Sequence, residues 1–405
     1  MKAYERFLNY VKFGTTSDEN APENVFPSTE GQRVLADELV KEMKQIGFAD
    51  ARCDANCYVY GSLPSNCGGS QPAIGLIAHM DTSSAASGTN IRPRIVKSYR
   101  GGDIVLNAER NLVLREEDFP CLSHCGGMDL IVTDGTTLLG GDDKAGIAEI
   151  LTAAENIVRG KIPHGKICVA FTPDEEIGRG ASRFDLAAFG ADFAYTVDGG
   201  KLDDLEYENF NAADAVLTVH GISTHPGDAK DKMRNAPLLG MEFHLMLPAA
   251  ETPEHTEGRE GFYFLEHIEG EVEKAVFHYI VRDHDSARFE ARKQYMQRAV
   301  NYLNAKYGTG TFELAIKDSY YNMKPVLEKH PEVVKRAEKA MRSAGVEPKA
   351  VPIRGGTDGA VLSQMGLPCP NLPTGGYNCH SRFEFVSIQE MNKVVEILMA
   401  LLKCQ

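Results

Sequence analysis

The sequence has no run of apolar residues long enough to cross a membrane. Such a span needs roughly 18 uninterrupted apolar residues, and no stretch here approaches that length. The first residues, MKAYERFLNYVKF, alternate charged and apolar side chains and lack the apolar core and cleavage site of a secretion signal. These absences predict a cytoplasmic protein without membrane contact, whose chain begins with an amphipathic helix.

Basic residues are scarce relative to acidic ones. The chain has 43 Lys and Arg against 57 Asp and Glu, which gives a formal net charge of −14. A polyphosphate surface would repel this charge, so nucleic acid is not expected as a partner. The chain has 405 residues, more than the roughly 250–300 that one hydrophobic core supports. We therefore expect two domains.

Closely spaced cysteine pairs are also missing. Nine cysteines, an odd number, in a long chain without an export signal predict reduced thiols and no disulfide framework. One group could hold a structural zinc ion: Cys53, Cys57, Cys67, Cys121, His124 and Cys125. Structural zinc sites usually contain two cysteines separated by two residues, and no pair in this group has that spacing. Buried or surface thiols are the simpler interpretation.

Predicted strands and helices alternate in the first half of the chain. Residues 73–78, 166–172 and 194–197 are short apolar runs, as buried strands are. Apolar residues in 30–48 and 145–158 follow the spacing of one helical face. This alternation predicts an α/β fold with a mostly parallel sheet covered by helices.

The pattern changes after about residue 207. Residues 214–220, 262–268 and 273–282 alternate apolar with polar side chains, which is typical of an antiparallel sheet with one covered face. Two helices are expected near 235–247 and 285–306.

The alternation of strands and helices returns near the end of the chain, with helices predicted at 331–344 and 388–403. We therefore interpret 208–320 as an inserted α+β domain. Residues 1–207 and 321–405 would then form one discontinuous domain.

Acidic and histidine side chains follow the ends of several predicted strands. They are His79 and Asp81 in AHMD, Asp142 and Asp143 in GGDDKAG, Glu175 and Glu176 in PDEEIG, Asp198 in TVDGG, and His380 in NCHSRFE. Each motif alone has a simpler interpretation, such as a helix cap, a turn or a solvated acidic pair. In open α/β sheets, however, the ligand crevice lies beyond the carboxyl ends of the strands. Histidines and carboxylates that meet there suit a pair of zinc ions.

In two pairs of neighbouring residues, the two side chains can have different roles. His79 and Asp81 are two residues apart, so in an extended segment they face the same way. Asp81 can then accept the free ring N–H of a metal-bound His79. In the second pair, Glu175 and Glu176, one carboxylate can bind metal while the other stays free as a base.

These segments, in this order, resemble the peptidase T family, which belongs to the co-catalytic zinc peptidases together with glutamate carboxypeptidases and acetylornithine deacetylase. The matching motifs include TDGTTLLGGDDKAGIAEI, FTPDEEIGRG, THPG, RDHD, RGGTDGA and GGYNCHSRFEF, and they span nearly the whole chain. The resemblance implies a zinc-peptidase-like fold whose inserted domain acts as a lid and can form a homodimer. It also implies removal of the N-terminal residue from small peptides, above all tripeptides, with two zinc ions per subunit.

The resemblance implies roles for individual residues. The metal ligands would be His79, Asp142, Glu176, Asp198 and His380, with Asp142 bridging the two ions. Glu175 would be the general base, and Asp81 would orient His79. A cis peptide bond between Asp142 and Asp143 is implied as well.

Substrate contacts are implied for four further residues. His225 of THPG would come from the inserted domain and hydrogen-bond the oxyanion; taken alone, it is equally a turn histidine. Arg354 of RGGTDGA would bind the C-terminal carboxylate of the substrate with its planar fork, and its alternative role is a structural ion pair, for example with Asp358. Asn378 and Asn235 are further candidates for polar contacts with the substrate.

Three other functions fit part of the pattern. A dipeptidase or N-acyl amino acid amidohydrolase of the same group would share the metal site and differ in substrate. A non-catalytic metal-binding or peptide-binding protein would need no free carboxylate beside the ligands, so Glu175 argues against it. A dinucleotide-binding oxidoreductase is disfavoured because no G-x-G-x-x-G follows the first strand.

Overall fold

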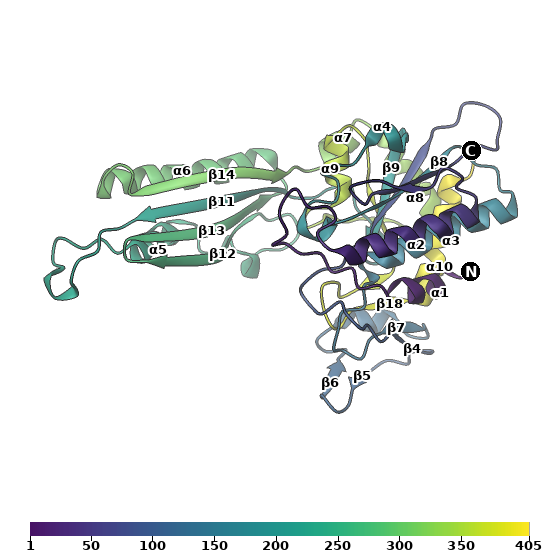
Figure 1. Cartoon of the computed structure of the whole chain (residues 1–405), viewed down its shortest axis with the longest axis horizontal. Coiled ribbons are helices and arrows are strands. Elements are labelled where there is room, and N and C mark those ends of the chain that lie inside the picture. The colour runs from purple at the N-terminus through teal and green to yellow at the C-terminus, as the bar shows by residue number, and fades with distance from the viewer. Residues whose placement is uncertain (405) are drawn as a thin grey trace. The chain divides into compact units, whose positions relative to one another are not determined.

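The computed structural model describes residues 1–404 and divides the chain into two compact units. The first unit contains residues 1–207, 325–351 and everything from Thr357 onward, and the second contains 208–324 and 352–356. Figure 1 labels their helices and strands. Within residues 1–404, no helix is both long enough and apolar enough to span a membrane.

Six strands form the main sheet of the first unit, in the order β1-β2-β8-β3-β9-β16. They are β1 (Arg52–Cys53), β2 (Val59–Leu63), β3 (Ile74–His79), β8 (Ile167–Thr172), β9 (Phe193–Gly199) and β16 (Asn371–Pro373). The last four are parallel, whereas β1 and β2 pair antiparallel at one edge. Every residue of β3 and β8 is buried, as expected for a parallel sheet covered on both faces. The predicted mostly parallel sheet is confirmed.

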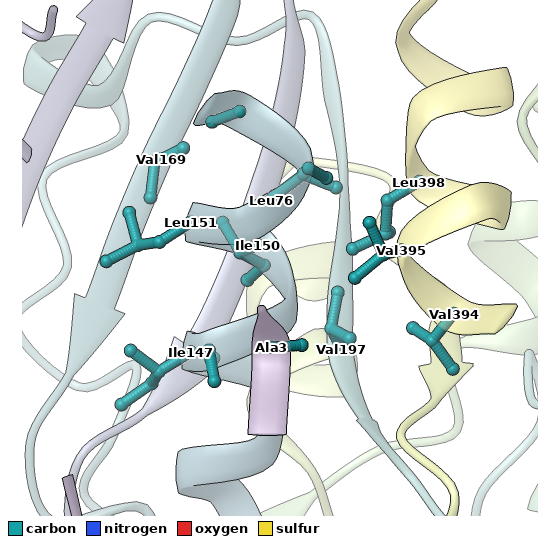
Figure 2. Packing of buried hydrophobic residues seen from close by; sticks show 14 of the residues in the cluster. Ala3, Leu76, Ile147, Ile150, Leu151, Val169, Val197, Val394, Val395 and Leu398 are labelled. Carbon is teal, nitrogen blue, oxygen red and sulfur yellow. The ribbon is translucent and has the colours of Figure 1, made fainter. Parts of the chain in front are cut away.

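Helices cover both faces of this sheet. One face packs against α2 (Glu30–Ile46) and α3 (Gly141–Gly160), and α1 (Ala3–Tyr10), α10 (Ile388–Leu402) and α8 (Pro331–Ser343) complete that side. The other face packs against α4 (Leu186–Phe189) and α9 (Asp358–Gln364). Figure 2 shows apolar side chains of α3, α10 and the central strands meeting in one cluster. Each large aliphatic side chain buried there stabilises the fold by roughly 1.5–3 kcal/mol, so the strand ends are held in fixed positions.

The first unit also contains smaller sheets that the sequence did not predict. One is antiparallel and consists of β17 (Gly376–Tyr377), β18 (Phe385–Ser387), β7 (Leu130–Val132) and β4 (Arg94–Val96). Two strand pairs complete the set: β5 (Ile104–Asn107) with β6 (Leu112–Leu114), and β10 (Asp204–Leu205) with β15 (Lys349–Ala350). The four-stranded sheet anchors the segment that leads to His380, because β17 and β18 flank it.

The second unit is built on a four-stranded antiparallel sheet in the order β12-β13-β11-β14. Its strands are β11 (Asn211–His220), β12 (Phe262–Glu271), β13 (Lys274–Asp283) and β14 (Phe312–Tyr320). Helices α5 (Ala236–Met246) and α6 (Ser286–Tyr307) pack on one face, against the alternate buried residues of β13 such as Phe277 and Tyr279. The short helix α7 (Lys324–Leu327) follows β14. The α+β character expected from the alternating segments is therefore present.

One disulfide bond joins Cys67 to Cys404, so the prediction that all thiols are reduced was wrong for this pair. Lys403 pairs with His164 in an isolated β-bridge, and the Cys404 N–H donates to the Pro163 carbonyl. These contacts bring the chain end to residues 163–164, and the N–H of Asn66 donates to the His164 carbonyl, which holds the loop with Cys67 against the same segment. The two cysteines are 337 residues apart in sequence, and no local pattern could pair them. The bond also removes Cys67 from the group considered for structural zinc, while the other seven cysteines are free.

Candidate metal centre

The five predicted metal ligands come from five separate segments of the first unit. His79 is the last residue of β3, and Asp198 lies near the end of β9. Asp142 is at the start of α3, Glu176 is in the 3-10 turn η2 (Glu175–Ile177) after β8, and His380 follows β17. Parallel strands end at one edge of their sheet, and ligands gather beyond that edge. The structure brings all five side chains into one cluster.

Asp142 lies at the centre of this cluster. Its Oδ1 is 2.8 Å from Nε2 of His79, and its Oδ2 is 3.1 Å from Nε2 of His380. The same nitrogen of His79 is 3.5 Å from Oδ1 of Asp198, and that of His380 is 2.8 Å from Oε2 of Glu176. Two groups of three side chains therefore share Asp142, and within each group the possible ligand atoms lie within 4.8 Å of one another. Such a pair of groups can hold two metal ions joined by one carboxylate.

The backbone around Asp142 is shaped to present its carboxylate. Asp142 and Asp143 have non-helical backbone angles at the start of α3, and the peptide bond between them is cis. Glu384 accepts backbone N–H groups from Leu139, Gly140 and Asp142, at 2.7, 2.8 and 3.0 Å. Asp143 faces elsewhere: its carboxylate accepts the N–H of His79 at 3.1 Å. One aspartate thus faces the cluster while its neighbour fixes the end of β3.

The electrostatics of the cluster fit a bound cation. Burial alone would lower the pKa of His79, but the carboxylates of Asp198, Asp142 and Asp81 raise it well above its usual value. Burial raises the pKa of Asp198 to about 7 and also raises the pKa of Glu176, whose Oε1 is buried without a hydrogen-bond partner. Across residues 1–404, no Lys or Arg forms an ion pair with these ligand carboxylates. Buried carboxylates need a positive charge, and imidazole with carboxylate is a donor set that zinc accepts.

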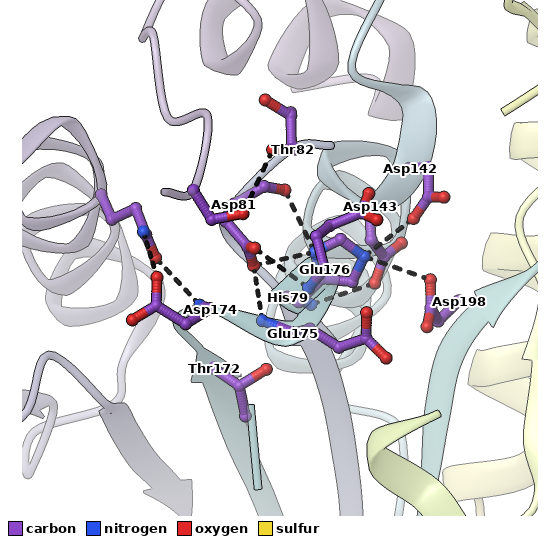
Figure 3. Close-up of polar contacts among 12 residues, drawn as sticks. His79, Asp81, Thr82, Asp142, Asp143, Thr172, Asp174, Glu175, Glu176 and Asp198 are labelled. Atoms are coloured by element: carbon purple, nitrogen blue, oxygen red, sulfur yellow. Dashed lines mark hydrogen bonds and ion pairs between the residues drawn. The ribbon is translucent and has the colours of Figure 1, made fainter. Parts of the chain in front are cut away.

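Asp81 connects the cluster to the turn after β8. Nδ1 of His79, the ring nitrogen that faces away from Asp142, lies 3.1 Å from the backbone carbonyl oxygen of Asp81 and 3.3 Å from its carboxylate Oδ1. The two carboxylate oxygens of Asp81 accept the backbone N–H groups of Glu175 and Glu176, at 3.0 and 3.1 Å (Figure 3). Asp81 thus contacts the ring of His79 through its carbonyl and carboxylate oxygens, and its carboxylate bonds the backbone of the turn.

The carboxylate of Glu175 has no structural partner in the part of the chain that the structure describes. It lies beside His79 (Figure 3), and it has no hydrogen bond or ion pair with any other part of residues 1–404. Burial raises its pKa well above the usual value. A carboxylate that is unpaired within residues 1–404 and lies beside the candidate metal ligands meets one requirement of a general base.

The second unit carries three of the residues predicted to contact substrate. His225 is exposed, and its Nδ1 accepts the N–H of Gly227 at 3.1 Å, so its neutral ring carries the proton on Nε2. Asn235 caps α5, because its side-chain oxygen accepts the N–H of Leu238 at 3.3 Å. These contacts give His225 the turn role that its sequence allowed and leave Nε2–H available as a donor.

The guanidinium of Arg354 donates hydrogen bonds to neutral groups of the second unit. It donates to the carbonyls of Gly258 and Glu260, at 2.9 and 3.2 Å, and to the hydroxyl of Thr256 at 3.0 Å. It also lies over the rings of Phe210 and Phe262, 5.2 and 5.7 Å from their centroids. In the described chain no carboxylate pairs with it.

Asp358, considered above as a partner of Arg354, belongs to the first unit and accepts the hydroxyl of Thr172 at 2.7 Å. Asn378 uses its amide within the first unit, where it donates to the carbonyl of Phe383 at 3.1 Å. A contact between Asn378 and substrate stays a prediction.

Sequence reasoning missed two groups that support the site. Glu384 stands four residues after His380 in NCHSRFEF, but its three N–H donors lie more than 240 residues away. The carboxylate of Asp174, the residue before Glu175, accepts hydrogen bonds from Ser28 and Gln32, which lie near the N-terminus. Only the folded structure joins these distant segments, so no local pattern could have shown them.

Comparisons with known proteins identify the family of the chain. Residues 137–403 match the model of Peptidase family M20/M25/M40. The chain is 54% identical to peptidase T of Caldanaerobacter subterraneus over 403 residues, covering 99% of this chain and 98% of that one. It is 53% identical to peptidase T of Clostridium novyi, with 98% of each chain covered.

Solved structures show the same fold. The aminopeptidase PepT from Bacillus cereus superposes with a TM-score of 0.78 at 22% identity, covering 99% of this chain and 97% of that chain. A tripeptidase from Staphylococcus aureus gives the same TM-score at 20% identity and the same coverage. The match over nearly the full length to curated relatives, together with the family model, settles the classification: this chain belongs to the peptidase T family, within Peptidase family M20/M25/M40.

Proposed function

We propose that this protein is a di-zinc aminopeptidase that hydrolyses the N-terminal peptide bond of tripeptides. As a family member it is a metal-dependent peptidase, and its relatives are named peptidase T and tripeptidase. The observation that carries the proposal is the position of Asp142, whose two oxygens face two histidines, with the free carboxylate of Glu175 beside them.

The metal ions would be held by the two groups that share Asp142. His79, Asp142 and Asp198 would hold one ion, and Asp142, Glu176 and His380 the other. Bound zinc would supply the positive charge that makes water acidic near neutral pH and that favours negative charge on the reacting carbonyl oxygen. Asp81 would keep the His79 ring turned so that Nε2 faces the ion.

Glu175 would move the proton. Its carboxylate is not used in any structural bond, and its backbone is fixed through the N–H that it donates to Asp81. It would take a proton from the attacking water and then donate it to the nitrogen of the departing peptide. Keeping the base in place while leaving its carboxylate free meets the geometric requirement for general acid–base catalysis.

The second unit would bind the substrate. His225 has Nε2–H available to donate to the oxyanion of the reacting carbonyl. Arg354 would bind the C-terminal carboxylate of the peptide with its planar fork, since its present partners are neutral. Asn235 and Asn378 would add polar contacts.

The second unit would also form a homodimer. Three apolar side chains of α5 are exposed, Leu238 by 63%, Met241 by 48% and Leu245 by 82%. Next to them β12 is the edge strand of its sheet, and it exposes Ile268, which pairs with the core residue Phe277 and so lies on the face that the helices cover. Exposed apolar patches and open strand edges are typical of surfaces that pair with another chain. The substitution Leu245→Asp should therefore lower the mass measured by light scattering from a dimer to a monomer, and an unchanged mass would remove this surface from consideration.

We place the protein in the cytoplasm because seven of its cysteines are free, which is usual for a reducing compartment. The Cys67–Cys404 bond is a single exception. Cell fractionation with antibody detection tests this location.

A substrate panel tests the proposed activity. We expect a tripeptide with free termini to be hydrolysed fastest, with slower turnover of dipeptides, tetrapeptides and N-acetylated tripeptides. A chelator should abolish turnover, and zinc should restore it. Preferred hydrolysis of N-acyl amino acids would instead indicate an amidohydrolase. A protein that holds two metal ions and hydrolyses none of the panel would be a binding protein.

Arg354 can be tested with a matched pair of substrates. Arg354→Gln should raise KM for a tripeptide with a free carboxylate and leave KM for the amidated tripeptide unchanged. Equal effects on both substrates would show that Arg354 does not bind the carboxylate.

A further inference from the structure

The turn that carries Glu175 begins at a residue in an unusual backbone conformation. Asp174 is fully buried and has left-handed backbone angles, φ 57° and ψ 30°. This conformation is unfavourable for a residue with a side chain, although Asp tolerates it better than most. Asp174 immediately precedes Glu175. The contacts that hold Asp174 in this conformation therefore also set the direction of the Glu175 side chain.

Asp174 is held by a closed set of hydrogen bonds from the start of the chain. Its carboxylate accepts the N–H and the hydroxyl of Ser28, at 2.8 and 2.5 Å, and the amide Nε2 of Gln32 at 2.6 Å. In return, the backbone N–H of Asp174 donates to Oε1 of the same Gln32 at 3.1 Å. Gln32 is fully buried in the first turn of α2. Its amide thus bonds both the side chain and the backbone of Asp174.

The turn is bonded on its other side by Asp81, which accepts the N–H groups of Glu175 and Glu176. Figure 3 shows Asp174 on the side of the turn away from Asp142 and Asp198. The bonds of Asp174 therefore fix the turn without taking part in the metal-ligand cluster. Removing them changes the support of the base and leaves the ligand side chains intact.

We infer that Asp174, bonded by Gln32 and Ser28, is a positioning residue for the general base Glu175. The inference rests on the proposed function, in which Glu175 moves the proton. It assigns helix α2 a part in catalysis, because α2 supplies the amide that holds the turn. A small displacement of a catalytic group lowers kcat, whereas substrate binding is unchanged.

A reciprocal exchange of the two side chains tests the inference. Gln32→Glu places two carboxylates against each other, and Asp174→Asn places two amides there, so each single variant breaks the set. The double variant, Gln32→Glu with Asp174→Asn, can remake the bond between the two side chains with donor and acceptor exchanged. It still offers an oxygen to the backbone N–H groups of Ser28 and of residue 174, and it keeps the total charge of the pair. Gln45→Glu is the matched control, since Gln45 is an exposed residue of the same helix.

Zinc-loaded enzyme should be assayed with a tripeptide well below its unfolding temperature. We expect each single variant to keep two zinc ions and nearly unchanged KM while kcat falls roughly 10–100-fold, as for other residues that orient catalytic groups. The double variant should recover most of the lost kcat, and the control should match the parent. Hydrogen exchange gives a second measurement: the amides of Glu175 and Glu176 should exchange faster in the single variants and return towards the parent rate in the double variant.

Folded, zinc-loaded single variants with the kcat of the parent would overturn the inference and assign these bonds to stability alone. A double variant that folds and binds zinc but stays as slow as the single variants would also overturn it. If Glu175→Ala retains activity, the base assignment itself fails, whereas an inactive Glu175→Ala beside fully active Asp174 variants rejects only the role of Asp174. A parent that hydrolyses no tripeptide rejects both.

Discussion

Replacing Glu175 by Gln separates metal binding from catalysis. The amide has the shape of the carboxylate but cannot accept a proton at neutral pH. The Glu175 carboxylate takes part in no hydrogen bond within residues 1–404, and the backbone N–H bonded to Asp81 is untouched by the substitution. The variant should therefore fold normally and keep the metal ligands in place.

The size of the effect follows from these contacts. A positioned general base contributes roughly 10²–10⁴-fold to the rate, which corresponds to about 2.7–5.4 kcal/mol of barrier at 1.36 kcal/mol per tenfold change. No structural bond is lost, so the free energy of unfolding should change by less than about 0.5 kcal/mol. We expect a large loss of kcat with little change in Tm or zinc content.

The assay combines steady-state hydrolysis of a tripeptide, elemental analysis and thermal unfolding on the same preparation. Glu176→Gln, in the same turn, is the contrasting variant, because it changes a ligand and should lose zinc. If Glu175→Gln keeps more than about a tenth of the parental kcat, general-base catalysis by this residue is too small to fit the expected range and the reasoning is refuted. A variant that loses zinc in parallel with activity would instead make Glu175 a ligand.

Three further predictions concern stability. Burial alone would raise the pKa of Glu208, but its arginine and lysine partners lower it. Their attraction therefore stabilises the fold above the unfolded pKa of about 4.3 and is lost as the pH falls through the lower folded pKa. Glu208→Gln should cost about 1 kcal/mol in urea unfolding at pH 7, and this cost should shrink steadily as the pH is lowered below about 4.3; a cost that stays constant with pH would contradict this. Thiol titration after denaturation without reductant should find the seven free cysteines, and nine reactive thiols in that titration would show that the Cys67–Cys404 bond is absent. Reducing this bond should lower the free energy of unfolding by about 3–5 kcal/mol. A Cβ at Gly146 would lie 1.9 Å from a carbonyl oxygen, whereas one at Gly126 would meet nothing within 4 Å, so Gly146→Ala should lower Tm by an amount equivalent to about 2 kcal/mol or more and Gly126→Ala should not.

The long periodic elements could be predicted from sequence because their patterns are local. The helices expected at 30–48, 331–344 and 388–403 correspond to α2, α8 and α10, with ends within two residues of the predicted ones. The buried strands β3, β8 and β9 could be predicted because each is a short run of apolar residues. In each case the face that packs against the core recurs with a fixed period.

Short strands and distant pairings could not be predicted in the same way. Strands β4, β7 and β18 have three residues each, too few for any period to appear. The strand β14 was overlooked although its burial alternates along nine residues; here the pattern was present in the sequence and was not used. The disulfide joins chain segments that only the fold brings together.

The same distinction between local patterns and distant contacts applies to the site. Convergence of the five ligands could be expected because each follows the end of a strand or starts the helix behind one. The groups that support the site, such as Glu384 and Gln32, were not predicted. They accept hydrogen bonds from the backbone N–H groups of Asp142 and Asp174, which lie more than 140 residues away in sequence. Their roles depend on the position of the partner backbone, which the sequence does not show.

The most direct test of the shared metal centre is the number of zinc ions bound by single-ligand variants. His79 and His380 each face one oxygen of Asp142, at 2.8 and 3.1 Å. Elemental analysis of purified protein should find two ions in the parent, about one in His79→Ala and in His380→Ala, and close to none in Asp142→Ala, as expected when one carboxylate serves both ions. Two ions retained by Asp142→Ala, or one ion in the parent, would contradict a centre built around this carboxylate.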